Sequence, residues 1–98
     1  MWKIGSMTVV HLSGHLVCRS SNDVAIVVEH LARHVELTYA EVGCHPFRVT
    51  PTDDPMVWHV DELFRDAAAF RTHQAQVASS DWGRVTARIE RRYEIEGL

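Results

Sequence analysis

The chain alternates between two kinds of hydrophobic periodicity, and the order of these segments restricts the fold more than any other sequence feature. Strand-like patterns occupy four segments, residues 8–18, 44–51, 56–64 and 85–95. Two segments, residues 23–40 and 67–78, carry apolar side chains at the three- and four-residue steps of amphipathic helices. The order β-α-β-β-α-β predicts a ferredoxin-like α+β fold, with a four-stranded antiparallel sheet and both helices on one face.

Local signals agree with these boundaries. Gly14, in the middle of the first strand, predicts a bulge or a close approach of another backbone. Ser21 or Asn22 is the expected N-cap of the first helix, and Gly43 can adopt the left-handed conformation that ends it. Residues 79–83 are expected to be irregular or a short helical turn.

A chain of 98 residues forms a single domain and buries only a modest share of its surface. Residues 8–98 are assigned to this domain, and residues 1–7 are interpreted as an N-terminal extension or an expression remnant. The face of the sheet opposite the helices would present Val57, His59 and Leu63, a mixed apolar and polar set. Packing against a second copy would cover that face, so a homodimer is expected.

Charge and composition exclude several classes of partner. A net charge of −3 speaks against nucleic acid and against anionic membrane, which both require concentrated positive charge. No apolar run reaches the length of a membrane span, and no signal peptide is visible. Cys18 and Cys44 are two isolated cysteines, so reduced, buried thiols in a cytoplasmic protein are the expected state.

Three pieces of the sequence resemble the antibiotic biosynthesis monooxygenase family. At the first helix-to-strand junction Thr38, Glu41 and the pair Gly43-Cys44 match residues that its members commonly carry. Tyr39 and Val42 depart from the pattern there, since Arg and Pro are frequent at these two positions. The other two pieces are the hairpin residues Asp53, Asp54 and Pro55, and the run Glu62, Asp66, Ala69, Phe70 and His73.

The resemblance, which covers Thr8 to the C-terminus, carries expectations about assembly and activity. It implies a dimeric α/β barrel of two sheets packed face to face, with a cleft between sheet and helices in each protomer. Known members oxidise quinols or anthrones with molecular oxygen and without metal or flavin, so no cofactor is expected here. Others degrade haem, and some process small signalling molecules, so the family alone does not determine the substrate.

His73 and Glu62 are the candidate catalytic residues. Strand parity places Glu62 beside Trp58 and Phe64, and the helical period places His73 beside Phe70. If both sides line the cleft, a carboxylate and an imidazole face one apolar pocket. Oxidation of a phenol without a cofactor needs a base that forms the electron-rich anion, and either group can serve. The alternative is that both residues only brace the packing of helix on sheet.

Aromatic side chains are candidates for the walls of a site that binds a planar molecule. For Trp58 and Trp82, a place in the wall of a binding site and a place in the hydrophobic core are equally expected. For Phe47 and Phe64, core packing is favoured. His11 is a further candidate substrate-binding residue, because the face it shares with His15 could line the barrel interior.

Seven histidines require that metal binding be weighed. His30 and His34 share a helix side at i, i+4, but they lie off the apolar stripe and no glutamate stands between them. A solvated helix flank is the preferred interpretation, and no metal site is predicted. Haem turnover is disfavoured because Phe64 stands where haem-degrading relatives carry tryptophan, and no histidine follows His73.

The leading hypothesis is therefore a cofactor-independent monooxygenase that acts on a small aromatic or quinol-like substrate. Two alternatives use the same cleft. One is a dimeric ligand-binding or stress-associated barrel without turnover, and the other is an isomerase or lyase acting on a small carbonyl compound.

Overall fold

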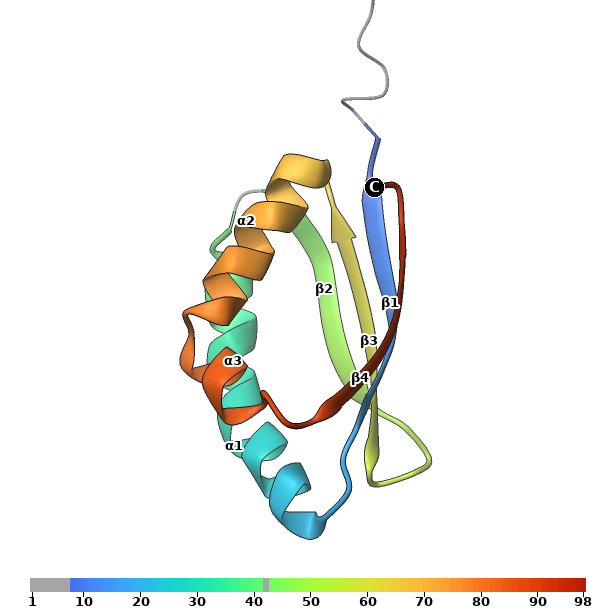
Figure 1. Ribbon diagram of the computed structural model, residues 1–98, viewed down its shortest axis with the longest axis vertical. Helices are drawn as coiled ribbons and strands as arrows, with labels where there is room; N and C mark the ends of the chain where they lie inside the picture. The colour runs from blue at the N-terminus through green and yellow to red at the C-terminus, as the bar shows by residue number, and fades with distance from the viewer. Residues whose placement is uncertain (1–7, 42) are drawn as a thin grey trace, which may run out of the picture.

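The computed structural model describes residues 8–41 and 43–98 and shows a four-stranded antiparallel sheet with its helices on one face (Figure 1). The spatial order of the strands is β2-β3-β1-β4. The predicted ferredoxin-like α+β architecture is confirmed, while the assignment of residues 1–7 lies outside the described residues. The elements are β1 (Val10–Val17), α1 (Ser21–Tyr39), β2 (Cys44–Pro51), β3 (Val57–Phe64), α2 (Ala67–Ala78), α3 (Asp81–Val85) and β4 (Glu90–Glu96).

Two boundaries differ from the sequence-based expectation. The N-cap of α1 is Ser20, because its backbone is extended and its hydroxyl accepts a hydrogen bond from the Asp23 N–H at 3.1 Å. The last strand begins at Glu90 rather than Val85. Residues 79–83, expected to be irregular or a short helical turn, contain the start of the five-residue helix α3, and the chain needs residues 86–89 to return from it to the sheet.

The hydrophobic core lies between the sheet and the helices. Phe47, Val60 and Phe64 contribute from β2 and β3, and Leu12 and Leu16 from β1. Phe64 packs edge-on against Phe70 of α2, with ring centroids 5.3 Å apart. Both cysteines are buried in this core as free thiols, as the sequence predicted.

The buried stripe of α1 is centred differently from the predicted one. Val27, His34 and Thr38 are its buried residues, whereas Val28 is 62% exposed. The interpretation of His34 as part of a solvated flank was therefore wrong. His34 follows Val27 by seven positions and precedes Thr38 by four, so it lies on the same side of the helix as both.

Gly14 allows the central strand and β4 to approach closely. Its φ is +150°, and a Cβ at this position would lie 2.0 Å from the carbonyl oxygen of Arg92. The predicted close backbone approach is confirmed. Gly14 pairs with Tyr93, so this contact also fixes where β4 places its side chains over the sheet.

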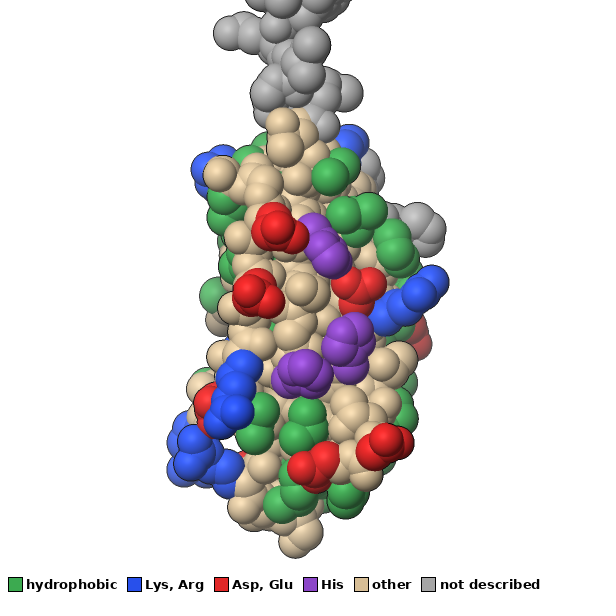
Figure 2. Space-filling model, turned by 90° about the vertical axis from the view of Figure 1, so that its right-hand side faces the viewer, with side chains coloured by type: hydrophobic (Ala, Val, Ile, Leu, Met, Phe, Trp, Pro, Cys, Tyr) green, Lys and Arg blue, Asp and Glu red, His purple; other side chains and the backbone are tan. Residues whose placement is uncertain are grey.

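The opposite face of the sheet carries a mixture of polar and apolar side chains. Figure 2 shows this face, with imidazoles over its middle and acidic, basic and apolar groups around them. His15 and His59 are cross-strand neighbours with ring centroids 5.5 Å apart, and His11 Nε2 lies 2.6 Å from Asp61 Oδ1. Within residues 8–41 and 43–98, no helix is long and apolar enough to span a membrane.

Candidate functional site

A pocket of about 130 Å³ opens between the sheet and the helices. Its lining combines four apolar side chains with five ionisable ones. Strands β1, β3 and β4 and all three helices contribute to it. The lining residues are Leu12, His34, Glu62, His73, Gln74, Val77, Trp82, Arg91, Tyr93 and Ile95.

His73 lies between the carboxyl groups of Glu41 and Glu62. Its Nδ1 is 3.2 Å from each carboxylate oxygen of Glu41, and its Nε2 is 3.6 Å from Glu62 Oε1. The imidazole is only 2% exposed. Helix α2 holds it there, and Asp66 caps that helix by accepting the Ala69 N–H at 2.8 Å.

This geometry selects a tautomer for the neutral imidazole of His73. A carboxylate only accepts hydrogen bonds, so Glu41 favours the form in which Nδ1 carries the proton. The lone pair then lies on Nε2. Because 3.6 Å is too long for a hydrogen bond to Glu62, Nε2 has no close partner there, and a hydroxyl group entering the pocket can donate to it.

Glu62 is a carboxyl group that favours its neutral form. Burial, together with the nearby charge of Glu41 and against the opposing charge of Arg91, raises its pKa to about 8. At neutral pH the group is therefore mostly protonated. The pocket thus places a proton acceptor, Nε2 of His73, beside a proton donor.

His34 and Trp82 form the wall on the helix side. Their rings stack with centroids 4.6 Å apart and an interplanar angle of 4°. Burial, with a smaller contribution from the charges of His73 and Arg91, lowers the pKa of His34 to about 4. His34 is therefore neutral at physiological pH and gives the pocket a flat, uncharged wall.

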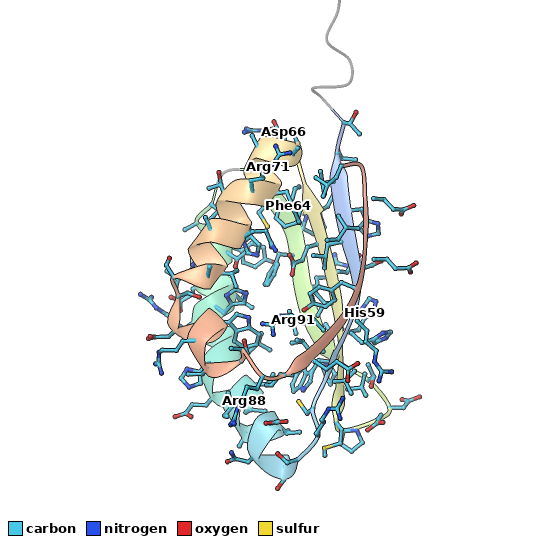
Figure 3. The ribbon with its side chains drawn as sticks, viewed as in Figure 1. His59, Phe64, Asp66, Arg71, Arg88 and Arg91 are labelled. Atoms are coloured by element: carbon cyan, nitrogen blue, oxygen red, sulfur yellow. The ribbon has the colours of Figure 1, made fainter. Side chains whose placement is uncertain are left out.

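Arg91 brings a permanent positive charge to the pocket from β4. Figure 3 shows it on the helix side of the sheet, whereas His59 lies on the opposite face. Its guanidinium donates to the carbonyl oxygens of Thr86 and Ile89 at 2.8 and 3.1 Å. Beside it, burial raises the pKa of Tyr93 to about 12, so this phenol stays protonated.

The structure brings together three of the seven residues predicted for the site. His73, Glu62 and Trp82 line the pocket. Phe47 and Phe64 are fully buried behind it, with ring centroids 5.9 and 5.3 Å from that of His73, so they support the imidazole as core residues. The remaining two, Trp58 and His11, are not among the lining residues; His11 pairs with Asp61 on the other face.

Four ionisable residues of the site were not predicted as site residues from the sequence. Arg91 and Tyr93 follow the same strand parity as Ile95, so the alternation of β4 contained their signal. His34 could have been predicted only if the buried stripe of α1 had been centred correctly. Glu41 follows the end of α1, and no periodicity extends to it. Among the described residues, no group of three or more His, Cys, Asp or Glu side chains could hold a metal ion.

The raised pKa of Glu62 predicts a pH-dependent stability. A folded-state pKa of about 8, against 4.5 for the free group, means that the folded chain binds more protons, so the free energy of unfolding falls as pH rises through this interval. His34 acts in the opposite direction between about pH 4 and 6.5, because its folded-state pKa is lowered. Of these two groups, only Glu62 acts between pH 6.5 and 8.

We therefore expect the urea midpoint of the wild type to decrease from pH 6.5 to 8.5, and that of Glu62→Gln to change much less. Exposed Glu36 provides the matched control, and Glu36→Gln should retain the wild-type slope. Equal slopes for wild type and Glu62→Gln would contradict the assignment of a neutral Glu62.

Comparison with known proteins identifies relatives at the level of family and fold. The family model described as antibiotic biosynthesis monooxygenase matches residues 21–84, about two thirds of the chain. No curated protein sequence matches. Among solved structures, Rv0793 from Mycobacterium tuberculosis superposes with a TM-score of 0.72 and 16% identity, covering 90% of this chain and 92% of that protein.

Two further structures show the same fold. PA3566 from Pseudomonas aeruginosa gives a TM-score of 0.69 with 19% identity, covering 93% of this chain and 92% of its own. A Bacteroides thetaiotaomicron protein described as a possible oxidoreductase gives a TM-score of 0.71 with 14% identity. The match covers 91% of this chain and 96% of that protein.

Proposed function

Because this chain belongs to the antibiotic biosynthesis monooxygenase family, we propose that it oxidises a small, single-ring quinol-like substrate with molecular oxygen and without a cofactor. The family supports a monooxygenase-like role in general. The observation that carries the finer proposal is His73, whose Nδ1 faces Glu41 and whose Nε2 faces the pocket beside Glu62. This arrangement supplies the base that cofactor-free oxidation of a phenol requires.

The reaction starts when Nε2 of His73 accepts the proton of a substrate hydroxyl. The resulting phenolate is electron-rich and donates electrons to molecular oxygen, and a bond forms between a ring carbon and one oxygen atom. The O–O bond and the C–H bond at the same ring carbon then break, and that carbon becomes a carbonyl. The departing oxygen takes one proton from neutral Glu62 and the other from the ring carbon and leaves as water, and the proton held by His73 restores neutral Glu62. In balance, one hydroquinone and one dioxygen molecule give one hydroxyquinone and one water, so one oxygen atom enters the ring and the other is reduced to water.

Arg91 would stabilise the negative charge that develops during this sequence. Its guanidinium is fixed by hydrogen bonds to Thr86 and Ile89 before any substrate binds, so it does not have to reorganise. The flat Trp82 wall and the apolar side chains of Leu12 and Val77 would hold the ring of the substrate.

The volume of the pocket favours a single ring. A cavity of about 150 Å³ accommodates benzene, and the pocket here measures about 130 Å³. A three-ring anthrone would require Trp82 or its neighbours to move. We therefore propose hydroquinones with small substituents as substrates and expect anthrones to be poor ones.

The test is oxygen uptake with hydroquinone, naphthohydroquinone and anthrone, combined with mass spectrometry of products formed under ¹⁸O₂. We expect consumption with the single-ring compound, at least tenfold slower turnover of anthrone, and one ¹⁸O atom in the product. Saturable binding without uptake would instead indicate a ligand-binding barrel, and conversion without ¹⁸O would indicate an isomerase or lyase.

We also propose that two copies pack through the sheet face opposite the helices. Val57, half-buried on that face, would become fully buried in the dimer, whereas Val28 of α1 is exposed and lies on the other side of the molecule. Light scattering after size-exclusion chromatography should give a dimer for the wild type and for Val28→Arg. Val57→Arg should give a monomer or an unstable chain. A wild-type monomer at micromolar concentration would refute the proposal.

A further inference from the structure

A second hollow is lined by residues of the helices alone and is larger than the pocket between the sheet and the helices, which we call the catalytic pocket. Its volume is about 270 Å³, and α1, α2 and α3 with the turn that joins the last two form its walls. We call it the outer groove. The residues that line it are His30, Arg33, His34, Leu37, Gln76, Ser79, Ser80, Asp81 and Trp82.

The outer groove and the catalytic pocket share one wall. His34 and Trp82 line both hollows, and their stacked rings separate them. Two glutamines of α2, by contrast, each line a single hollow. Gln74 lines only the catalytic pocket, and Gln76 lines only the outer groove. The two glutamines therefore provide a matched pair on a single helix.

Two residues that line the outer groove each carry a buried polar atom without a hydrogen-bond partner among the described residues. The two atoms are Nδ1 of His34, whose side chain is 3% exposed, and Oε1 of Gln76. The serine hydroxyls nearby are already satisfied, since Ser79 donates to the Ala75 and Gln76 carbonyls and Ser80 donates to the Val77 carbonyl. Buried polar atoms are rarely left unpaired, so the pair marks a place where a partner is missing.

The charges around the outer groove are already balanced. Arg33 Nη1 lies 3.4 Å from Glu36 Oε1, and Asp81 Oδ1 lies 3.4 Å from Arg84 Nη2. His30 Nε2 is 3.6 Å from Glu29 Oε2. No unopposed cation therefore remains among the lining residues to attract an anion. The amide oxygen of Gln76 is an acceptor only, so its missing partner must be a donor.

We propose that the outer groove is a second small-molecule site, which binds a neutral molecule carrying N–H or O–H donors. When the ligand binds, the Gln76 side chain turns so that Oε1 accepts from a donor group of the ligand, and a small shift of the His34 ring brings Nδ1 within reach of a group that can donate or accept. This site is separate from the one that holds the oxidised ring, so its existence does not depend on the proposed reaction.

Benzamide and benzoate are suitable probes, because they share a shape and only benzamide is neutral with N–H donors. Binding is followed by the backbone amide resonances of Ser79 and Ser80 in ¹H–¹⁵N spectra of the full chain. We expect saturable shifts with benzamide and at least fivefold weaker binding of benzoate. Gln76→Leu should weaken benzamide binding by about three- to tenfold, the effect of one lost hydrogen bond.

Gln74→Leu is the matched control and should leave benzamide binding at Ser79 and Ser80 unchanged. If Gln76→Leu loses its dispersed spectrum, Gln76→Glu keeps the acceptor and should retain benzamide binding while weakening benzoate further. The proposal is overturned if benzamide causes no saturable shift, if benzoate binds as tightly, or if Gln74→Leu reduces binding as much as Gln76→Leu.

Discussion

Replacing His73 by alanine should lower kcat/KM for hydroquinone by about 10²- to 10⁴-fold, the usual contribution of a general base. The reason is the position of the imidazole. Its Nδ1 is committed to Glu41 at 3.2 Å, and its Nε2 is directed towards Glu62 without a hydrogen bond. Among the described residues that line the pocket, His34 carries the only other imidazole, and its ring is stacked on Trp82.

Two further variants separate catalysis from folding. His73→Gln retains most of the volume and polarity of the buried side chain but cannot act as a base, so it should be as inactive as His73→Ala. Thr72→Ala changes the adjacent, exposed residue of the same helix and should keep wild-type activity. A folded His73→Gln protein with more than a third of wild-type kcat/KM would exclude His73 as the base.

Gly14→Ala should reduce the free energy of unfolding by about 2–4 kcal/mol, the combined effect of backbone strain and overpacking. A Cβ at this position would lie 2.0 Å from the Arg92 carbonyl oxygen, and the glycine has a φ of +150°. Either β4 must move away from β1 or the backbone must change conformation. Urea unfolding followed by circular dichroism measures the loss.

Ser13→Ala tests whether alanine itself is harmful in this strand. Ser13 is the preceding residue of β1 and has an ordinary strand conformation, so this variant should stay within about 0.5 kcal/mol of the wild type. Because Gly14 pairs with Tyr93 and Leu16 pairs with Arg91, a displaced β4 should also weaken substrate binding. A Gly14→Ala protein as stable as Ser13→Ala would contradict the close approach of the two strands.

The order of strands and helices could be predicted from the sequence because the two-residue period of strands differs from the three- and four-residue steps of helices. The positions of the apolar side chains along the chain are enough to distinguish the two. β3 illustrates this: the alternation placed Glu62 on the same face as Trp58 and Phe64, and the structure shows that this face looks towards the helices. The start of β4 was harder to locate, since Val85 and Ala87 continue the alternation by chance although α3 ends at Val85.

The candidate site was harder to predict because its members depend on tertiary contacts. His34 is polar, so it was excluded from an apolar stripe on which it actually lies. Glu41 stands out in the sequence only as a residue that family members commonly carry, and periodicity does not indicate its contact with His73 of α2. Trp58 fulfils the strand parity and still does not line the pocket.

The most direct test of the central claim is to record the imidazole nitrogen resonances of His73 in a ¹⁵N-labelled protein, first alone and then with hydroquinone under anaerobic conditions. The account predicts a protonated Nδ1 and an unprotonated Nε2 in the free protein, with the Nε2 resonance moving saturably as hydroquinone binds. A protonated Nε2 with an unprotonated Nδ1 would contradict the account. So would an Nε2 resonance whose chemical shift does not change at saturating hydroquinone.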